Sequence, residues 1–491
     1  MTVRVASLKS AEQFRAHCQS LGIEIPCDDS ILTGADSPLT QPLSNGSLNG
    51  KTPSNRWVIH PMEGWDGTTT GGTTEEVRRR WQRFGLSGAK LIFGGEAMAV
   101  RADGRANPRQ LILTEENRQD ITELRHLLIQ AHESRYGTSE DLLIGFQLTH
   151  SGRFCRPEDP KRWQPRVAYR HPLLDSRFQV TQENQVFTDE EIEILIADYV
   201  KAARLAQEIG ADFVDLKHCH GYLLHEFLGA HTRPGRFGGS FENRTRILRD
   251  IVAGIRRDGN PIGLAVRLSA FDLVPFRPDP NQSAPGKPGP GIPESYATCL
   301  PYRYGFGINV DHPTQPDLTE SHRFLALCGE LGIRLVNLSA GSPYYNPHIQ
   351  RPASFPPSDG YLPPEDPLVG VARQVHAVRE LKAQAPAGMT LIGTGYSYLQ
   401  EYLPQVAQAT VRLGWTDMIG LGRMTLSYPD MLADATLKGA LTPKLICRTF
   451  SDCTTAPRNG LISGCYPLDK YYAQKPENEQ LKALKKQPRA Q

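Results

Sequence analysis

Short apolar runs alternate with segments of helical periodicity along most of this 491-residue chain, and this alternation constrains the fold more than any other feature. The eight runs are residues 57–62, 90–100, 142–148, 212–219, 262–269, 333–340, 390–395 and 416–423. Strands that are apolar throughout, rather than on alternate residues, are typical of a parallel sheet buried on both faces. The pattern therefore predicts an α/β fold in which helices cover a parallel sheet.

A closed sheet explains the pattern better than an open one. A doubly wound nucleotide-binding domain would carry a glycine-rich turn directly after its first strand, whereas the first run here continues as HPMEGW at residues 60–65. We therefore predict a (β/α)8 TIM barrel over residues 56–440. Residues 1–55 are expected to form an N-terminal extension, with a hairpin or loop in its turn-rich part, SNGSLNGKTPSN.

Two segments depart from the repeat. Residues 275–316 are rich in proline and glycine and follow the fifth run, so they are predicted to lie at the end of the barrel where active sites are built and to cover the site. Residues 441–491 form a C-terminal extension. Its last part, KPENEQLKALKKQPRAQ, is charged and poor in apolar residues, which favours a frayed or disordered tail.

The charge balance points to a small-molecule partner. Lys and Arg number 55 against 53 for Asp and Glu, and a net charge of +2 provides no general field for nucleic acid or an anionic membrane. No apolar window approaches the length of roughly 18 residues that a bilayer requires. We expect a soluble, cytoplasmic protein, and homo-oligomerisation is left open.

Two glycine turns suggest a phosphate site. Gly393–Tyr396 follows the seventh run and Gly420–Arg423 follows the eighth. In barrels these two positions commonly bind phosphate through backbone N–H groups, and Arg423 would add a charged donor. Barrels that bind phosphorylated substrates without a flavin share this arrangement, so the turns alone leave the ligand open.

Several motifs, in the same order along the chain, resemble the old yellow enzyme family of FMN oxidoreductases. They are NRWVIHPM, GFQLTHSGR, HGYLLHEFL followed by GRFGGSFENRTR, VRLS, and GLGR followed by YPD. The resemblance covers about residues 50–470 and extends to the barrel of larger relatives that reduce 2,4-dienoyl-CoA or demethylate trimethylamine. It implies an FMN cofactor, with NADH or NADPH as the electron donor.

The resemblance assigns residues to the flavin. Arg267 and Gln147 would bind the pyrimidine edge, where a cation stabilises the negative charge of the reduced ring and an amide offers both a donor and an acceptor. A salt bridge at the barrel rim is the alternative role of Arg267. By resemblance alone, further residues pack against the ring or bind the phosphate; these are Pro61, Met62, Glu96, Ala97, Gly395, Tyr396, Gly422 and Arg423.

The segment DLKHCHGYLLHEF is the least regular match. Family members carry His-x-x-Asn or His-x-x-His before Gly-Tyr, whereas this chain has Lys217 and His220 before Gly221 and Tyr222. Lys217 and His220 are predicted to stabilise negative charge on a substrate oxygen, and Tyr222 to deliver a proton. The lysine hints at an anionic or strongly polarised substrate group. Pairing of Lys217 with a rim carboxylate such as Glu96 is the alternative.

Other residues are candidates for the substrate side. Tyr344, Tyr345, Asn346 and His348 follow the sixth run and combine aromatic faces with polar tips, although packing of the loop would explain them equally well. Trp65 and Arg153 are further candidates at the rim.

A cysteine cluster follows the barrel. Larger relatives carry a [4Fe–4S] cluster on four cysteines in this region, but only Cys447, Cys453 and Cys465 are present here. We interpret the site as vestigial or incomplete, so no metal is favoured.

The leading functional hypothesis is NAD(P)H-driven reduction of an activated C=C bond by hydride transfer from flavin N5. The alternatives are an FMN-dependent dehydrogenase or demethylase of an amine, a flavin-binding protein without turnover, and a flavin-free barrel enzyme that binds a phosphorylated substrate.

Overall fold

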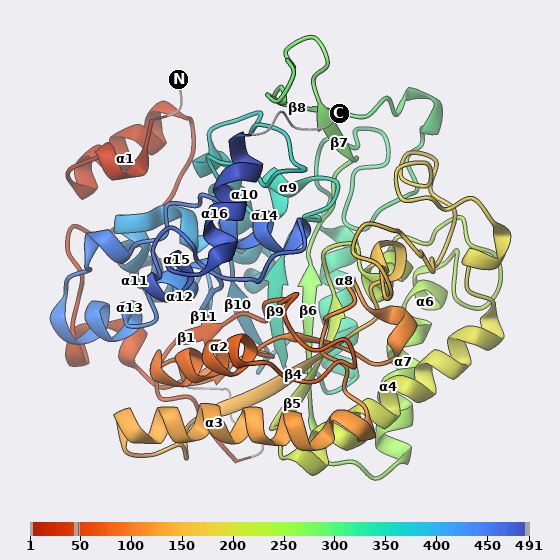
Figure 1. Cartoon of the computed structure of the whole chain (residues 1–491), viewed down its shortest axis with the longest axis horizontal. Helices are drawn as coiled ribbons and strands as arrows, with labels where there is room; N and C mark the ends of the chain where they lie inside the picture. Colours follow the sequence, from red (N-terminus) through yellow and green to blue (C-terminus); the bar gives the residue numbers. More distant parts are fainter. Residues whose placement is uncertain (1–2, 44–47, 49, 487–491) are drawn as a thin grey trace.

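The computed structural model describes residues 3–43, 48 and 50–486, and within them nine parallel strands form a closed barrel (Figure 1). The strands are β1 (Trp57–Ile59), β2 (Leu91–Ile92), β3 (Ala97–Ala99), β4 (Leu143–Thr149), β5 (Phe213–His218), β6 (Gly263–Ser269), β9 (Leu335–Ser339), β10 (Thr390–Gly393) and β11 (Met418–Leu421). β1 pairs with both β2 and β11, which closes the ring. β2 and β3 both pair with β4, so they are two parts of one barrel strand interrupted at Gly94–Gly95. The predicted (β/α)8 barrel is confirmed.

Helices surround the barrel. The main helices of the β/α repeat are α2 (Glu75–Leu86), α3 (Arg118–Tyr136), α4 (Asp189–Ile209), α7 (Arg246–Arg257), α8 (Thr319–Glu330), α10 (Pro367–Ala383) and α11 (Leu403–Arg412). The other described helices are α1 (Ala11–Ser20), α5 (Leu223–Leu228), α6 (Phe241–Arg244), α9 (Pro347–Gln350), α12 (Arg423–Ser427), α13 (Met431–Ala433), α14 (Asp452–Arg458), α15 (Lys470–Ala473) and α16 (Pro476–Lys486). Local signals set their ends: α4 begins with a capping box between Thr188 and Glu191 and ends at Gly210 in the left-handed conformation.

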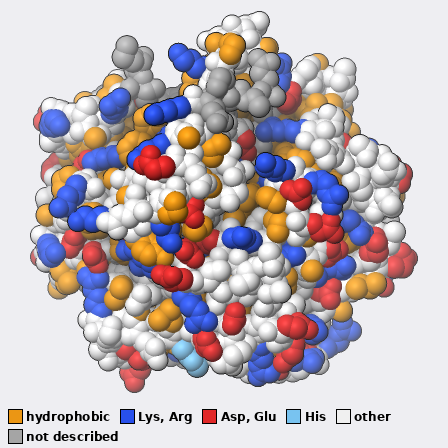
Figure 2. All heavy atoms as spheres, viewed as in Figure 1, with side chains coloured by type: hydrophobic (Ala, Val, Ile, Leu, Met, Phe, Trp, Pro, Cys, Tyr) orange, Lys and Arg blue, Asp and Glu red, His pale blue; other side chains and the backbone are white. Residues whose placement is uncertain are grey.

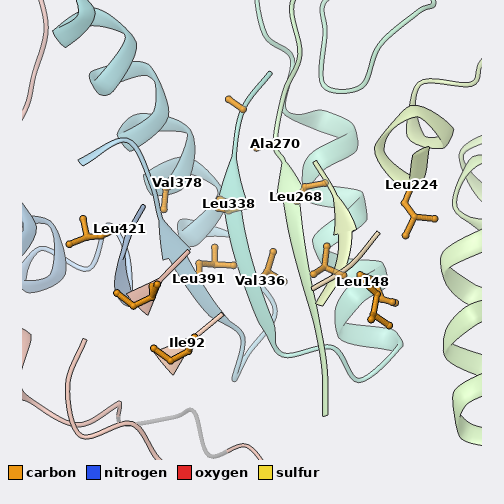
Figure 3. Close-up of a cluster of buried hydrophobic side chains, with 14 of the residues drawn as sticks. Ile92, Leu148, Leu224, Leu268, Ala270, Val336, Leu338, Val378, Leu391 and Leu421 are labelled. Carbon is orange, nitrogen blue, oxygen red and sulfur yellow. The ribbon is translucent and has the colours of Figure 1, made fainter. Parts of the chain in front are cut away.

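Two apolar layers hold the barrel. The outer layer lies between strands and helices and includes Leu268, Val336, Leu338 and Leu391 (Figure 3). The inner layer fills the amino-terminal half of the barrel with a separate cluster; among its members are Val58, Phe93, Leu143, Phe213, Leu335, Ile392 and Met418. Because side chains alternate along a strand, the next inward-facing positions are two residues further on. Four of them are buried polar residues, namely His60, Asp215, Asn337 and Thr394. The interior of the barrel is thus filled by apolar side chains toward the amino ends of the strands and by polar side chains toward their carboxyl ends.

The insertion after the fifth barrel strand does not cover the site, contrary to the prediction. It contains the antiparallel hairpin of β7 (Phe276–Pro278) and β8 (Gly291–Pro293). Phe276 N–H donates to the carbonyl of Tyr345 at 2.8 Å, and residues 275–316 contribute none of the side chains that line the main cavity in the described part of the chain. The insertion packs behind the loop that follows β9.

The C-terminal segment is more ordered than the sequence suggested. The charged tail forms α16, where Leu481 is buried in a cluster with Tyr466 and Tyr472. Lys485 forms an ion pair with Asp452 of α14 at 2.8 Å. The prediction of a disordered tail was therefore wrong up to Lys486, because one buried apolar side chain and an ion pair to α14 dock this short helix. Part of the predicted N-terminal hairpin, residues 44–47 and 49, lies outside the described residues.

Charged side chains of both signs are mixed over the surface seen in Figure 2, in keeping with the near-neutral net charge. Among the described residues, none of the helices is both long and apolar enough for a transmembrane span.

Candidate functional site

A cavity of about 250 Å³ opens at the carboxyl ends of the barrel strands. Its walls come from the segments after β1, β5, β9, β10 and β11 and from the C-terminal segment around α14. The carboxyl end is where barrels assemble their ligand sites, because the loops there vary independently of the strands. Most of the polar residues singled out from the sequence face this cavity.

At one edge of the cavity, a buried aspartate orients an amide and a cation. Gln147 Nε2 donates to Asp215 Oδ2 at 2.5 Å, and the Arg267 backbone N–H donates to Asp215 Oδ1 at 2.6 Å. Burial raises the pKa of Asp215 to about 7, and the hydrogen bond from Gln147 and the Arg267 charge limit that rise. The donation from Gln147 leaves its carbonyl oxygen available to a donor in the cavity.

Arg267 does not form a salt bridge at the barrel rim with any described residue. Its Nη1 donates to the carbonyl of Pro61 at 3.2 Å, and its buried Nε has no hydrogen-bond partner. Burial lowers the pKa of this guanidinium, which shows how little the protein itself compensates its charge. A ligand that presents negative charge at this edge would satisfy it. The sequence analysis missed Asp215; its signal was an acidic residue at the inward-facing position two residues before Lys217 on the same strand.

The catalytic candidates of β5 surround a carboxylate that the sequence analysis did not single out. Tyr222 Oη donates to Glu63 Oε2 at 2.6 Å, and Lys217 Nζ lies 3.5 Å from the same oxygen. Lys217 Nζ also lies 3.5 Å from the centre of the Tyr222 ring, a close cation–π contact. Burial raises the pKa of Tyr222 well above its usual range, and the Glu63 charge raises it further.

The partner of Lys217 is thus Glu63 and not Glu96. Glu96 is buried beside Arg80, with Oε1 2.8 Å from Nε. Burial raises the pKa of Glu96 to about 7, with Arg80 acting against that rise. Glu63 comes directly after the Pro61–Met62 pair that the family resemblance marked, and the motif NRWVIHPM ends before it.

His220 lies beside these groups in the neutral form. It adopts a left-handed backbone conformation (φ 66°), which turns its ring toward the cavity, and its Nε2 lies 2.9 Å from the Ser339 hydroxyl. Burial lowers its pKa well below the usual range, and the nearby charges of Arg267 and Lys217 lower it further. His218, two residues earlier, packs against Phe324 of α8, with ring centroids 5.4 Å apart.

The opposite end of the cavity has two arginines without carboxylate partners. Gly395 and Gly422 each precede a helical turn, and Arg423 Nη2 donates to the carbonyl of Pro352 at 3.0 Å. Arg423 Nη1 and Arg351 Nη2 are buried and have no hydrogen-bond partner, and neither residue forms an ion pair with the described part of the chain. Burial lowers the pKa of Arg351 to about 9, and repulsion from Arg423 contributes.

The other residues predicted for the cofactor and substrate divide into two groups. Pro61, Met62 and Tyr344 line the cavity with Trp65. The other predicted residues do not line the cavity. Ala97 is a buried strand residue, and the Tyr396 hydroxyl lies 3.2 Å from that of Thr410. Tyr345 and Asn346 form hydrogen bonds with Asp272, His348 forms one with Tyr361, and Arg153 is buried between Glu226 and Asp175. These side chains fix the loops that carry the lining residues.

Cys447, Cys453 and Cys465 come together at a narrow cleft next to the cavity, and all three are free thiols. Among the described residues, no group of three or more histidine, cysteine or acidic side chains has a geometry that could hold a metal ion. Burial raises the pKa of Cys447 and of Cys465, which keeps these thiols protonated.

The two ends of the cavity match a flat ring with a phosphate tail. The buried Nε of Arg267 and the amide of Gln147 suit the electron-rich edge of an isoalloxazine, and the unpaired nitrogens of Arg351 and Arg423 suit a phosphate dianion. FMN carries both groups. Fold and cavity therefore place the protein in the class of FMN-binding (β/α)8 barrels.

Comparison with known proteins finds similarity to one family of flavin oxidoreductases. Residues 38–279 match the model of the NADH:flavin oxidoreductase / NADH oxidase family. An NADH:flavin oxidoreductase of Gibberella zeae is 32% identical over 195 residues, which are 37% of this chain and 45% of that protein. An NADPH dehydrogenase of a Geobacillus species is 30% identical over 241 residues, 47% of this chain and 63% of that protein.

Solved structures agree on the fold. The old yellow enzyme of Pichia sp. AKU4542 superposes with a TM-score of 0.54 at 20% identity, covering 83% of this chain and 89% of that one. A 2-naphthoyl-CoA reductase superposes with a TM-score of 0.61 at 17% identity, covering 90% of this chain and 58% of that one. Residues 38–279 are thus similar to the NADH:flavin oxidoreductase / NADH oxidase family. It spans between about half and two thirds of the length of these curated relatives.

Proposed function

We propose that this protein is an FMN-dependent NAD(P)H oxidoreductase that reduces a C=C bond conjugated to an electron-withdrawing group. The observation that carries the proposal is the convergence of Lys217, His220 and Tyr222 on one cavity that also has a flavin-type edge at Arg267. Both ends of the cavity would hold FMN, and Lys217, His220 and Tyr222 would face the substrate.

The chain's own residues supply binding and polarisation. Arg351 and Arg423 would hold the phosphate of FMN, while Gln147 and Arg267 would hold the pyrimidine edge. When bound and reduced, FMN supplies a hydride. Lys217 and neutral His220 present N–H groups to a substrate oxygen, and donors fixed where negative charge develops lower the barrier of hydride addition. Tyr222 exchanges a proton with the neighbouring carbon.

The charged donor at Lys217 favours a strongly polarised acceptor. An ammonium stabilises a developing oxyanion more than a neutral imidazole does, so acyl compounds, nitroalkenes and unsaturated carboxylates are the first acceptors to try. The side chains of Tyr222 and Tyr344 and the ring of Trp65 give the same wall of the cavity an aromatic face, which suits a planar conjugated system.

Stopped-flow spectroscopy of the FMN-loaded protein tests the proposal. Rapid bleaching of the flavin by NADH or NADPH, followed by reoxidation by an enone, nitroalkene or dienoyl compound, is the expected result. Bleaching by an amine and not by either nicotinamide would support the amine dehydrogenase instead. Failure of every acceptor would leave a flavin-binding protein without turnover, and a protein that refuses FMN would contradict the proposal altogether.

A further inference from the structure

The carboxylate of Glu63 is the centre of the active-site hydrogen bonds, although the family motif marks only the residues before it. Its Oε2 accepts from Tyr222 Oη at 2.6 Å and faces Lys217 Nζ at 3.5 Å. Its Oε1 accepts from Trp65 Nε1 at 3.1 Å. The side chain is 13% exposed, so it is enclosed by the protein yet still reached by water from the cavity.

The direction of the Tyr222 hydrogen bond creates a problem for proton transfer. The phenol proton points at Glu63, and if Tyr222 gave it up while Glu63 is ionised, two negative oxygens would stand 2.6 Å apart. Only Lys217 would compensate them directly, because Arg458, the next cation beside Tyr222, is already paired with Asp359. Like charges this close strongly disfavour ionisation of both groups.

We propose that the Glu63 carboxyl group holds the proton that this site transfers, and that this proton passes between Glu63 and the substrate carbon through the hydroxyl of Tyr222. Because Glu63 acts through Tyr222, it is a positioning and relay residue. The proposal rests on the proposed function only for the identity of the substrate.

In the reductive direction, one hydride and one proton add across the C=C bond of the substrate. The hydride brings its electron pair to the β-carbon, and the π electrons of the C=C bond form a new bond between the α-carbon and the Tyr222 proton. The O–H bond of the Glu63 carboxyl breaks as its proton bonds to the phenol oxygen. Glu63 is left as a carboxylate beside the ammonium of Lys217 and takes its next proton from water in the cavity.

The same path runs backwards when Glu63 is ionised. A proton leaving a saturated substrate carbon would then move to Tyr222 as the phenol proton moves to Glu63. Protonation of Glu63 therefore favours reduction, and its ionisation favours removal of a proton from the substrate.

The groups that face Glu63 come from four segments. They are Trp65 of its own loop, Lys217 and Cys219 of the β5 segment, Tyr222 at the start of α5, and Tyr344 after β9, whose hydroxyl lies 3.2 Å from that of Tyr222. Among the described residues Lys217 is the one cation that pairs with Glu63, while Arg156 lies over the Trp65 ring and Arg458 over the Tyr344 ring. The net charge of the cluster therefore changes with the proton on Glu63. The ionisation of Tyr222 must then depend on the charge at position 63.

The first experiment measures that dependence without any substrate. The ultraviolet titration of the wild type minus that of Tyr222→Phe isolates the phenol of Tyr222, and the same difference is taken in a Glu63→Gln background. Tyr222 should ionise at a lower pH without the Glu63 charge. An unchanged titration of Tyr222 would overturn the proposal.

The second experiment follows the two half-reactions of the FMN-loaded enzyme, with NADPH as reductant and 2-cyclohexen-1-one as acceptor. Reoxidation of the wild type should depend on pH and accelerate toward the acid end, whereas Glu63→Gln should give a flat profile and, at the acid end, a rate about a hundredfold lower. Reduction by NADPH should change less than about twofold, since it does not use Tyr222.

Control variants separate a relay from a structural role. Glu63→Asp keeps a carboxylate and should retain a pH-dependent reoxidation, and Glu183→Gln, which removes an exposed and distant charge, should behave as the wild type. A Glu63→Gln profile that keeps the wild-type slope, or an equal loss in both half-reactions, would overturn the proposal. If the wild type does not react with the enone at all, the proposed function fails, and the titration of Tyr222 alone decides the role of Glu63.

Discussion

Asp215 makes the stability of this protein depend on pH in a direction that can be worked out in advance. Its carboxyl is fully buried between the Gln147 amide and the Arg267 backbone, and burial raises its pKa from 3.8 to about 7. As the pH rises through 3.8, Asp215 loses its proton in the unfolded chain but keeps it in the folded protein. The folded state then binds more protons, so stability falls until the pH passes about 7 and is constant above it.

The magnitude follows from the gap between the two pKa values. A gap of about three, at about 1.36 kcal/mol for each pH unit, amounts to about 4 kcal/mol of unfolding free energy lost between pH 4 and pH 8. Asp215→Asn has no proton to lose and is uncharged like the protonated acid. Its oxygen can accept from the Arg267 N–H, and its NH2 group can donate to the Gln147 carbonyl once that side-chain amide turns over. The difference in stability between variant and wild type should therefore grow by about 4 kcal/mol over this range in favour of the variant.

Urea unfolding of the FMN-free protein at a series of pH values measures this difference. Other buried acids also titrate in the range, but they are common to both proteins and cancel. Asp311→Asn, at an exposed position, is the matched control and should follow the wild type. A difference between Asp215→Asn and wild type that does not change with pH would refute the reasoning, since it would mean that Asp215 is ionised in the folded state throughout.

Three further predictions concern the cofactor and the chemistry. Arg351→Ala and Arg423→Ala should each weaken FMN binding by about 10- to 100-fold, because each removes a charged hydrogen bond to the phosphate worth about 1.5–3 kcal/mol. The fluorescence of FMN on its release measures the affinity. Unaltered binding by Arg351→Ala would mean that Arg351 is not part of the phosphate site. Lys217→Met should slow reoxidation by an enone by about 10²- to 10³-fold and leave the NADPH step intact, as stopped-flow traces would reveal; an equally slow NADPH step would argue against a role on the substrate. Gly420→Ala should cost about 1–3 kcal/mol in urea unfolding, because its Cβ would lie 1.9 Å from His60 Cε1; an unchanged midpoint would mean that the His60 ring moves freely.

The sequence predicted the parts of the site that follow from strand periodicity. Gln147, Lys217 and Arg267 occupy inward-facing positions near the carboxyl ends of their strands, so locating the strands also located these side chains. The glycine turns after the last two strands were found for the same reason.

Contacts between distant segments were beyond the sequence. Glu63 meets Lys217 and Tyr222 across more than 150 residues, and nothing in the segment around Glu63 indicates which side chains the barrel brings to it. Tyr345 and Asn346 looked like ligands from their composition, but they bind Asp272, a residue that the closed loop buries beside them. The length and position of the insertion led to the prediction that it covers the site. Its packing against Tyr345 depends instead on the shape of the loop after β9, which the sequence does not reveal.

The wall that α14 contributes to the cavity has a consequence for how the protein matures. Thr454 and Arg458 reach the loop after β9 through Arg351 and Asp359, and Ser463 accepts a hydrogen bond from the Trp65 N–H at 3.1 Å. These residues leave the ribosome after every barrel strand has been synthesised. A nascent barrel that closes before residues 452–463 have emerged would lack one wall of the cavity and would retain a flavin poorly. Cofactor loading should therefore be among the final steps of biogenesis.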